Sequence, residues 1–234
     1  MKRNDGAMYV QYGGSFKAPK EWRNFDASIT LKWERTPILG RLFTKNAQRF
    51  PPSAECGDII KGLPLPKESC RGVYASHVLE HLSLEDFHRA IENTMRILEK
   101  GGLFRLVVPD LEWAAKEYIS RIDSGDPQAN ALLLREACLG HEKRVRGPIG
   151  LLYGFLETSS HLWMWDAPSL KHALAEHGFQ SIRRCHFGDC ADSMFISRRC
   201  RQIRTRSRDG SNALIFQQCK QYCLGCEPIS LGWF

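Results

Sequence analysis

Val73–Leu82, which reads VYASHVLEHL, is the stretch that decides the fold. It begins with apolar, β-branched and aromatic residues, as a buried strand does, and it runs into Ser83–Asp86, which is typical of a helix start. A strand that ends at small and polar side chains before a helix is where α/β proteins build ligand sites. The rest of the chain is therefore placed around this strand end.

The chain on both sides of this stretch alternates between extended and helical patterns. Apolar residues recur at helical spacing over Leu84–Leu98, and Gly101-Gly102 predicts the end of that helix. Leu103–Val108 is almost continuously apolar, which indicates a strand buried on both faces. This alternation predicts parallel strands joined by crossovers. The further expected strands are Met8–Tyr12, Trp22–Ser28, Glu55–Ile60, Ser181–Phe187 and Asn212–Gln217, and the further helical segments are 110–140, broken near 123–127, and Asp166–Glu176.

Composition narrows the class of protein. A chain of 234 residues is enough for one domain with a sizeable core. Most of the net charge of +7 lies in residues 197–234, where six Arg and one Lys stand against one Asp and one Glu. Nine cysteines, an odd number, favour reduced thiols over a disulfide framework. Because the sequence has neither a long apolar run nor a signal-peptide pattern, we expect no membrane span and a cytoplasmic location.

Two early strand ends carry residues suited to a nucleoside-like ligand. Gly13 and Gly14 follow the first expected strand, and a glycine turn there allows the backbone to approach a ligand closely. Asp26 lies near the end of the second, where a carboxylate can accept hydrogen bonds from both hydroxyls of a ribose. The alternative is that the glycines form an ordinary turn.

The run Asp58–Asp110 resembles a known family. It contains the segments GLPLP, YASHVLEHL, LEKGG and RLVVPDLE, and it is similar to class I S-adenosylmethionine-dependent methyltransferases, more narrowly to the bacterial methyltransferase type 11 group. The resemblance extends over about residues 8–190. It implies an α/β fold with a Rossmann-like, seven-stranded, mostly parallel sheet and a helical insertion after the fifth strand at about residues 111–165. The basic tail at 191–234, rich in Cys and Arg, departs from the family pattern.

The resemblance also implies where S-adenosyl-L-methionine would bind. The cofactor would lie across the carboxyl ends of the strands. Its methionine part would lie near Gly13 and Gly14, its ribose at Asp26, its adenine at Asp58 and Ile59, and Ser76 and His77 would line it at the fourth strand end.

The methyl acceptor would be held beside the cofactor. His77 and His81 are one helical turn apart, and His81 is the candidate base or acceptor-positioning group, with simple packing at the helix start as the alternative. Asp110 is a candidate acceptor ligand, with helix capping as the alternative. His161 and Trp165 are candidates for an acceptor wall, with attachment of the insertion to the sheet as the alternative.

These patterns predict a methyltransferase that acts on a small molecule or a saccharide. A cofactor-binding fold with impaired catalysis is one alternative, because Ser15 stands where the family usually has a third glycine. An RNA methyltransferase that uses Arg198–Arg208 is another, although the lack of aromatic residues in that segment makes nucleic acid a poor candidate. Cys219, Cys223 and Cys226 match an iron–sulfur spacing outside its structural context, so no metal centre is predicted.

Overall fold

The structure is a computed structural model, and it describes residues 6–14, 16–37, 49–140, 160–185, 189–190, 192–196 and 213–220. Its elements are β1 (Met8–Tyr12), β2 (Arg23–Asp26), α1 (Ile29–Glu34), β3 (Ala54–Cys56), β4 (Cys70–Ser76), a 3₁₀ helix η1 (Leu79–His81), α3 (Leu84–Ile97), β5 (Leu98–Pro109), α4 (Leu111–Asp123), α5 (Ala129–Glu136), α7 (Ala167–Glu176), β6 (Phe179–Arg184), α8 (Ser193–Ile196) and β7 (Ala213–Lys220).

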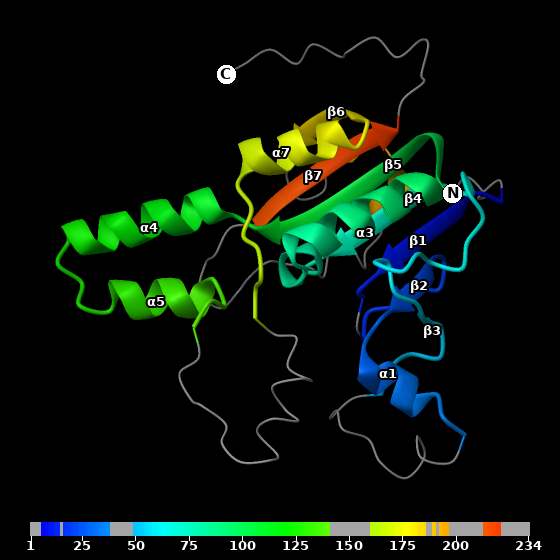
Figure 1. Ribbon diagram of the computed structural model, residues 1–234, viewed down its shortest axis with the longest axis horizontal. Helices are drawn as coiled ribbons and strands as arrows, with labels where there is room; N and C mark the ends of the chain where they lie inside the picture. Colours follow the sequence, from blue (N-terminus) through cyan, green and yellow to red (C-terminus); the bar gives the residue numbers. More distant parts are fainter. Residues whose placement is uncertain are drawn as a thin grey trace.

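One seven-stranded sheet organises these elements, in the order β3-β2-β1-β4-β5-β7-β6 (Figure 1). β3, β2, β1, β4 and β5 are parallel to their neighbours, whereas β7 is antiparallel to both β5 and β6. The predicted Rossmann-like, mostly parallel sheet is therefore confirmed. β7 lies between β5 and β6 and falls on the strand expected at Asn212–Gln217, so the sheet continues past residue 190.

Helices and a small aromatic cluster cover the two faces of the sheet. The main core packs the apolar sides of α3 and α7 against β1, β4 and β5. On the opposite face, Tyr9 and Tyr74 pack with Trp22 and with Phe195 of α8, and the Trp22 and Phe195 rings are 5.1 Å apart, edge to face. Both faces of β5 are thus buried, as its continuous apolar run predicted.

Several predicted strand boundaries differ from the structure, among them Trp22–Ser28, where β2 covers Arg23–Asp26, and Ser181–Phe187, where β6 covers Phe179–Arg184. Two further differences have an identifiable cause. The third strand ends at Cys56 rather than at Ile60, because Asp58 Oδ1 accepts a hydrogen bond from Ile60 N (3.0 Å) and closes a turn. α3 ends at Ile97, before the two glycines, and β5 begins at Leu98. Gly101, with φ +74°, and its neighbour lie inside β5, where the pairing with β4 shifts register.

The segment after β5 forms the predicted helical insertion. α4 and α5 lie side by side and project from the sheet beyond the end of β5 (Figure 1). The chain returns at Trp165, which pairs with Asp110 in a short parallel bridge, and Leu111 N donates to Trp165 O (2.9 Å). The insertion therefore leaves the sheet and rejoins it at one point, the carboxyl end of β5.

No helix in the described ranges is long and apolar enough to span a membrane.

Candidate functional site

The carboxyl ends of β1 and β4 meet at a glycine. Gly13 adopts φ +68°, and its N–H donates to Phe25 O of β2 (2.9 Å). A Cβ on Gly13 would lie 2.1 Å from Val78 Cγ2, just beyond β4. Gly14 is equally enclosed, because a Cβ there would lie 2.0 Å from Gln11 Nε2. Glycine is thus required at Gly13 for the ends of β1 and β4 to come together, and at Gly14 for the turn after β1 to close against Gln11 and Lys17.

Asp26 ends β2 with its carboxylate held in place. The residue is 7% exposed, and its Oδ1 accepts a hydrogen bond from Ser28 N (2.8 Å). Its backbone carbonyl accepts from Gly57 N (3.1 Å), which aligns the end of β3 beside it. A carboxylate fixed at this edge has the chemistry that a ribose diol needs.

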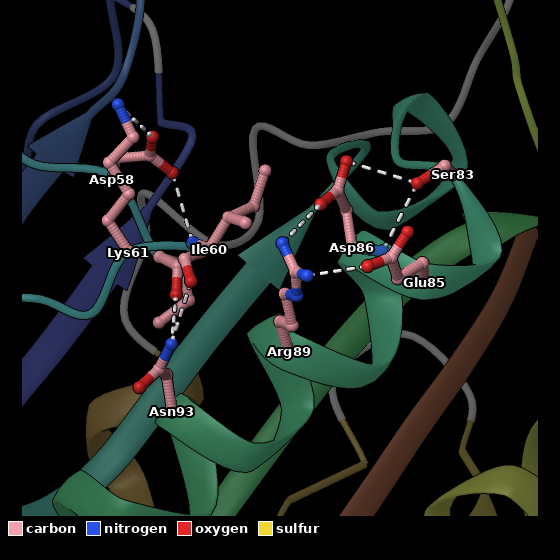
Figure 2. A network of polar contacts seen from close by, with 9 residues as sticks. Asp58, Ile60, Lys61, Ser83, Glu85, Asp86, Arg89 and Asn93 are labelled. Atoms are coloured by element: carbon pink, nitrogen blue, oxygen red, sulfur yellow. Dashed lines mark hydrogen bonds and ion pairs between the residues drawn. The ribbon is translucent and has the colours of Figure 1, made fainter.

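The loop after β3 carries Asp58 and Ile59 and is attached to α3. Asn93 Nδ2 donates to the carbonyls of Ile59 (2.9 Å) and Ile60 (3.0 Å); Figure 2 shows both bonds leaving the Asn93 side chain. The Asp58 carboxylate closes the turn and is about a quarter exposed, whereas the Ile59 side chain is buried in the main core. Any contact of Ile59 with an adenine ring would therefore be made mainly by its backbone.

The start of α3 is fixed by a side-chain cap. Ser83 Oγ accepts from Asp86 N (3.1 Å) and donates to Asp86 Oδ2 (3.0 Å), as predicted from the sequence (Figure 2). Arg89 lies between the carboxylates of Asp86 and Glu85 one turn later. The cap sets the point at which η1 passes into α3.

β4 ends at Ser76, and the next residue, His77, has an unusual backbone conformation. His77 has φ +53°, in the left-handed region that residues other than glycine seldom adopt. Its N–H still donates to Val107 O (3.0 Å), so the pairing with β5 continues to this point. Its ring Nδ1 lies 3.1 Å from Glu80 Oε1, and its side chain is 42% exposed. Such strain is typical of functional strand ends.

Three side chains from distant segments converge next to this strand end. Glu80 and His81 lie on η1, and His161 lies on the return segment of the insertion. One possible ligand atom from each lies within 4.8 Å of those of the other two, and the two imidazole rings are 5.0 Å apart. His81 and His161 were both predicted to lie at the acceptor, whereas nothing in the sequence pattern brings Glu80 together with them.

Burial shapes the protonation of His161. Desolvation lowers the pKa of His161 below its ordinary value, and the nearby His81 and His77 act in the same direction. Glu80 and a backbone hydrogen bond at Ala137 oppose the shift. The imidazole of His161 is thus biased toward its neutral form.

Asp110 and Trp165 are engaged by the fold. Asp110 Oδ1 caps α4 by accepting from Trp113 N (3.2 Å), and its Oδ2 accepts from Arg184 Nη2 (2.7 Å). The Trp165 ring is 3% exposed and packs 4.3 Å from Phe87. These contacts are the ones expected if Asp110 caps a helix and Trp165 attaches the insertion to the sheet. An acceptor role for either residue therefore stays a prediction. Ser15, Arg198–Arg208 and the cysteines at 223 and 226 lie outside the described residues.

Comparison with known proteins identifies the family. The family model described as a methyltransferase domain matches residues 15–183. No relative was found among curated proteins. Solved structures with a similar chain path include a methyltransferase from Mesorhizobium loti (16% identity, 92% of this chain and 91% of that chain, TM-score 0.46) and the YcgJ protein from Bacillus subtilis (13%, 93% and 93%, TM-score 0.48).

A third is a possible histamine N-methyltransferase from Thermotoga maritima (13% identity, 92% of this chain and 82% of that chain, TM-score 0.46). At these identities and scores the neighbours carry no information on the acceptor. The family match alone spans well over half of the chain, so the chain belongs to the methyltransferase domain family.

Proposed function

We propose that this protein is an S-adenosylmethionine-dependent methyltransferase whose acceptor is a small molecule or a saccharide. The observation that carries the proposal is the grouping of Gly13, Asp26 and His77 at the carboxyl ends of adjacent parallel strands. In open α/β sheets, ligands bind at this edge. The family match gives the reaction class.

The residues at this edge fit the donor. The Asp26 carboxylate would hold the ribose hydroxyls, Asp58 would accept from the adenine amine, and the turn at Gly13 and Gly14 would approach the methionine part with its backbone. Bound S-adenosylmethionine would supply an activated methyl group on a sulfonium. The protein then has to bring the acceptor atom into line with that methyl group and hold it there.

Two histidines are suited to remove a proton from a hydroxyl acceptor. The Ser160 carbonyl can only accept, so His81 Nδ1 (3.1 Å away) must carry a hydrogen, which leaves a lone pair on Nε2. The Glu80 carboxylate orients His77 in the same way, and the exposure of His77 makes its Nε2 the more accessible base. The proposed acceptor therefore lies over the end of β4.

Calorimetric titration with S-adenosylhomocysteine is the test. We expect saturable binding to the wild type and weaker binding to Asp26→Asn. Asp123→Asn, at the exposed end of α4, removes the same charge away from the site and should bind as the wild type does. Absence of heat at near-millimolar ligand, from protein that unfolds cooperatively, would refute the proposal.

Turnover distinguishes an active enzyme from a cofactor-binding fold without catalysis. S-adenosylhomocysteine formation is followed with hydroxylated small molecules and sugars as acceptors. Cofactor binding without product from any acceptor would favour the inactive alternative.

We also propose a cytoplasmic location, which agrees with the free thiols of the described cysteines, among them Cys70 and Cys185.

A further inference from the structure

The cluster of Glu80, His81 and His161 contains buried polar atoms without partners. Glu80 is fully buried, and its Oε2 has no hydrogen-bond partner among the described residues. His161 Nδ1 is buried and equally without a partner there. Burial of a carboxylate oxygen without a hydrogen-bond partner is costly, so a group that accepts its electron pair would stabilise the arrangement.

The other polar atoms of the cluster are already fixed by neighbours. Glu80 Oε1 is paired with His77 Nδ1 at 3.1 Å, and His81 Nδ1 is paired with the Ser160 carbonyl at 3.1 Å. Among the described residues, this leaves Glu80 Oε2 and His81 Nε2 to offer electron pairs. Protein ligands of metals are usually oriented in this way, by a hydrogen bond at the atom that does not face the metal.

The backbone holds the two segments together independently of these side chains. The Glu80 carbonyl accepts from Leu162 N (2.8 Å) and Trp163 N (3.2 Å), and His161 N donates to Cys138 O (3.2 Å). His161 is therefore held against η1 by main-chain contacts on both sides. The backbone therefore keeps the three side chains close together before any ion arrives.

We propose that Glu80, His81 and His161 form a binding site for a divalent transition metal of the Zn²⁺ type. Two imidazoles and one carboxylate suit zinc and its neighbours, whereas Mg²⁺ and Ca²⁺ take oxygen ligands. Bonds of about 2.0–2.2 Å would place the ligand atoms about 3.3 Å apart in a tetrahedral site. In the structure these atoms lie within 4.8 Å of one another, so side-chain rotations that move each atom by about 1 Å would bring them to coordination distance.

The site would select a hydroxyl acceptor, a consequence that rests on the proposed function. Three protein ligands leave the fourth position of a tetrahedral site for an acceptor oxygen, and coordination lowers the pKa of its hydroxyl. His77 Nε2 takes the hydroxyl proton. The oxygen forms its new bond to the methyl carbon as the bond from that carbon to sulfur breaks, with the electron pair staying on sulfur.

Metal binding is measured on the full chain without any cofactor. Protein stripped with a chelator is dialysed against Zn²⁺, and bound zinc is counted by mass spectrometry for the wild type, Glu80→Gln and His161→Asn. We expect the wild type to retain one equivalent more than either variant. Zinc at about 100 times its Kd should raise the Tm of the wild type by about 5–10 °C and leave both variants unchanged.

Controls separate this site from others in the chain. His172→Ala removes a histidine with a 78% exposed side chain on α7 and should bind zinc as the wild type does. Co²⁺ replaces zinc to test the nine cysteines, because thiolate ligands add strong near-ultraviolet charge-transfer bands that a His₂Glu site lacks. The metal-free Tm of Glu80→Gln and His161→Asn reports whether each variant is folded.

Two results would overturn the proposal: equal zinc content in the wild type and in folded variants, or cobalt spectra dominated by thiolate bands that His161→Asn leaves unchanged. Titration of the same samples with S-adenosylhomocysteine keeps the two proposals apart. Cofactor binding without metal binding refutes only the metal site, and metal binding without cofactor binding refutes only the proposed function.

Discussion

Replacement of Gly13 by alanine tests the packing of the strand ends most directly. At φ +68°, a residue with a side chain incurs about 1–2 kcal/mol of backbone strain. The new Cβ would also lie 2.1 Å from Val78 Cγ2, and such overpacking costs about 1–3 kcal/mol. We expect Gly13→Ala to lower the free energy of unfolding by about 2–5 kcal/mol, a Tm decrease of roughly 4–20 °C.

A matched glycine separates the two contributions. Gly125, after α4, adopts a similar φ of +75°, but a Cβ there would meet no atom within 4 Å. Gly125→Ala should therefore show the backbone strain alone. Val78→Ala alone removes two methyl groups and costs about 1–2 kcal/mol, yet it also removes the atoms that the new Cβ would strike.

Urea unfolding of the four proteins, Gly13→Ala, Val78→Ala, their double variant and Gly125→Ala, gives the required free energies. The double variant should recover about 1–3 kcal/mol relative to the sum of the single variants. Gly13→Ala should also weaken S-adenosylhomocysteine binding, because the turn that approaches the cofactor must shift. Strict additivity, with Gly13→Ala no worse than Gly125→Ala, would refute the close approach of β1 to β4.

Three further changes test other contacts. Asp26→Asn should weaken S-adenosylhomocysteine binding about 10–100-fold in calorimetry, because hydrogen bonds to a charged acceptor are the stronger kind, and unchanged affinity would exclude the ribose role. Burial and the adjacent His88 lower the pKa of His177, against the opposing effects of Glu92 and Glu176. The unfolded chain therefore binds the proton more readily, and the free energy of unfolding decreases as the pH falls through about 6.5. His177→Gln should make the free energy from urea unfolding less dependent on pH over that range, and an equal pH dependence in both proteins would contradict this origin. Asp110→Ala should lower the free energy of unfolding by about 1–3 kcal/mol through loss of the α4 cap, and Arg184→Gln by about 1–3 kcal/mol because it leaves the buried Oδ2 of Asp110 without its ion-pair partner; urea unfolding identical to the wild type for either variant would contradict the corresponding contact.

Much of the fold follows from local sequence patterns. Helix starts were predicted where a side chain caps the backbone, and both Ser83 and Asp166 do so in the structure. Strands buried on both faces were recognised from continuous apolar runs such as that of β5. The boundary between α3 and β5 was predicted wrongly because the same local sequence signal fits two structures. Gly101-Gly102 was interpreted as a helix end, but the glycines form an irregularity inside a strand that had already begun.

The candidate site was predictable only in part, because sequence spacing locates strand ends but not their distant partners. Asp26 is the last residue of β2 and His77 follows β4, so the sheet topology alone brings them to one edge. Glu80 and His161 are separated by the whole insertion, and their meeting depends on how α4 and α5 return the chain to the sheet. Asp110 shows the converse, since a residue at a promising strand end has both carboxylate oxygens in structural contacts.

The way in which the two segments are joined also determines which variants are informative. Glu80 holds the return segment through its backbone carbonyl, whereas its side chain contributes the free oxygen to the cluster. Glu80→Gln therefore keeps the main-chain contacts to Leu162 and Trp163 and changes the charge, one ligand atom and the charged partner of His77. Loss of metal in that variant, with an unchanged fold, would thus report on coordination rather than on the position of the insertion. Leu162→Pro makes the complementary change, because it removes the 2.8 Å hydrogen bond to Glu80 O and keeps every side chain of the cluster.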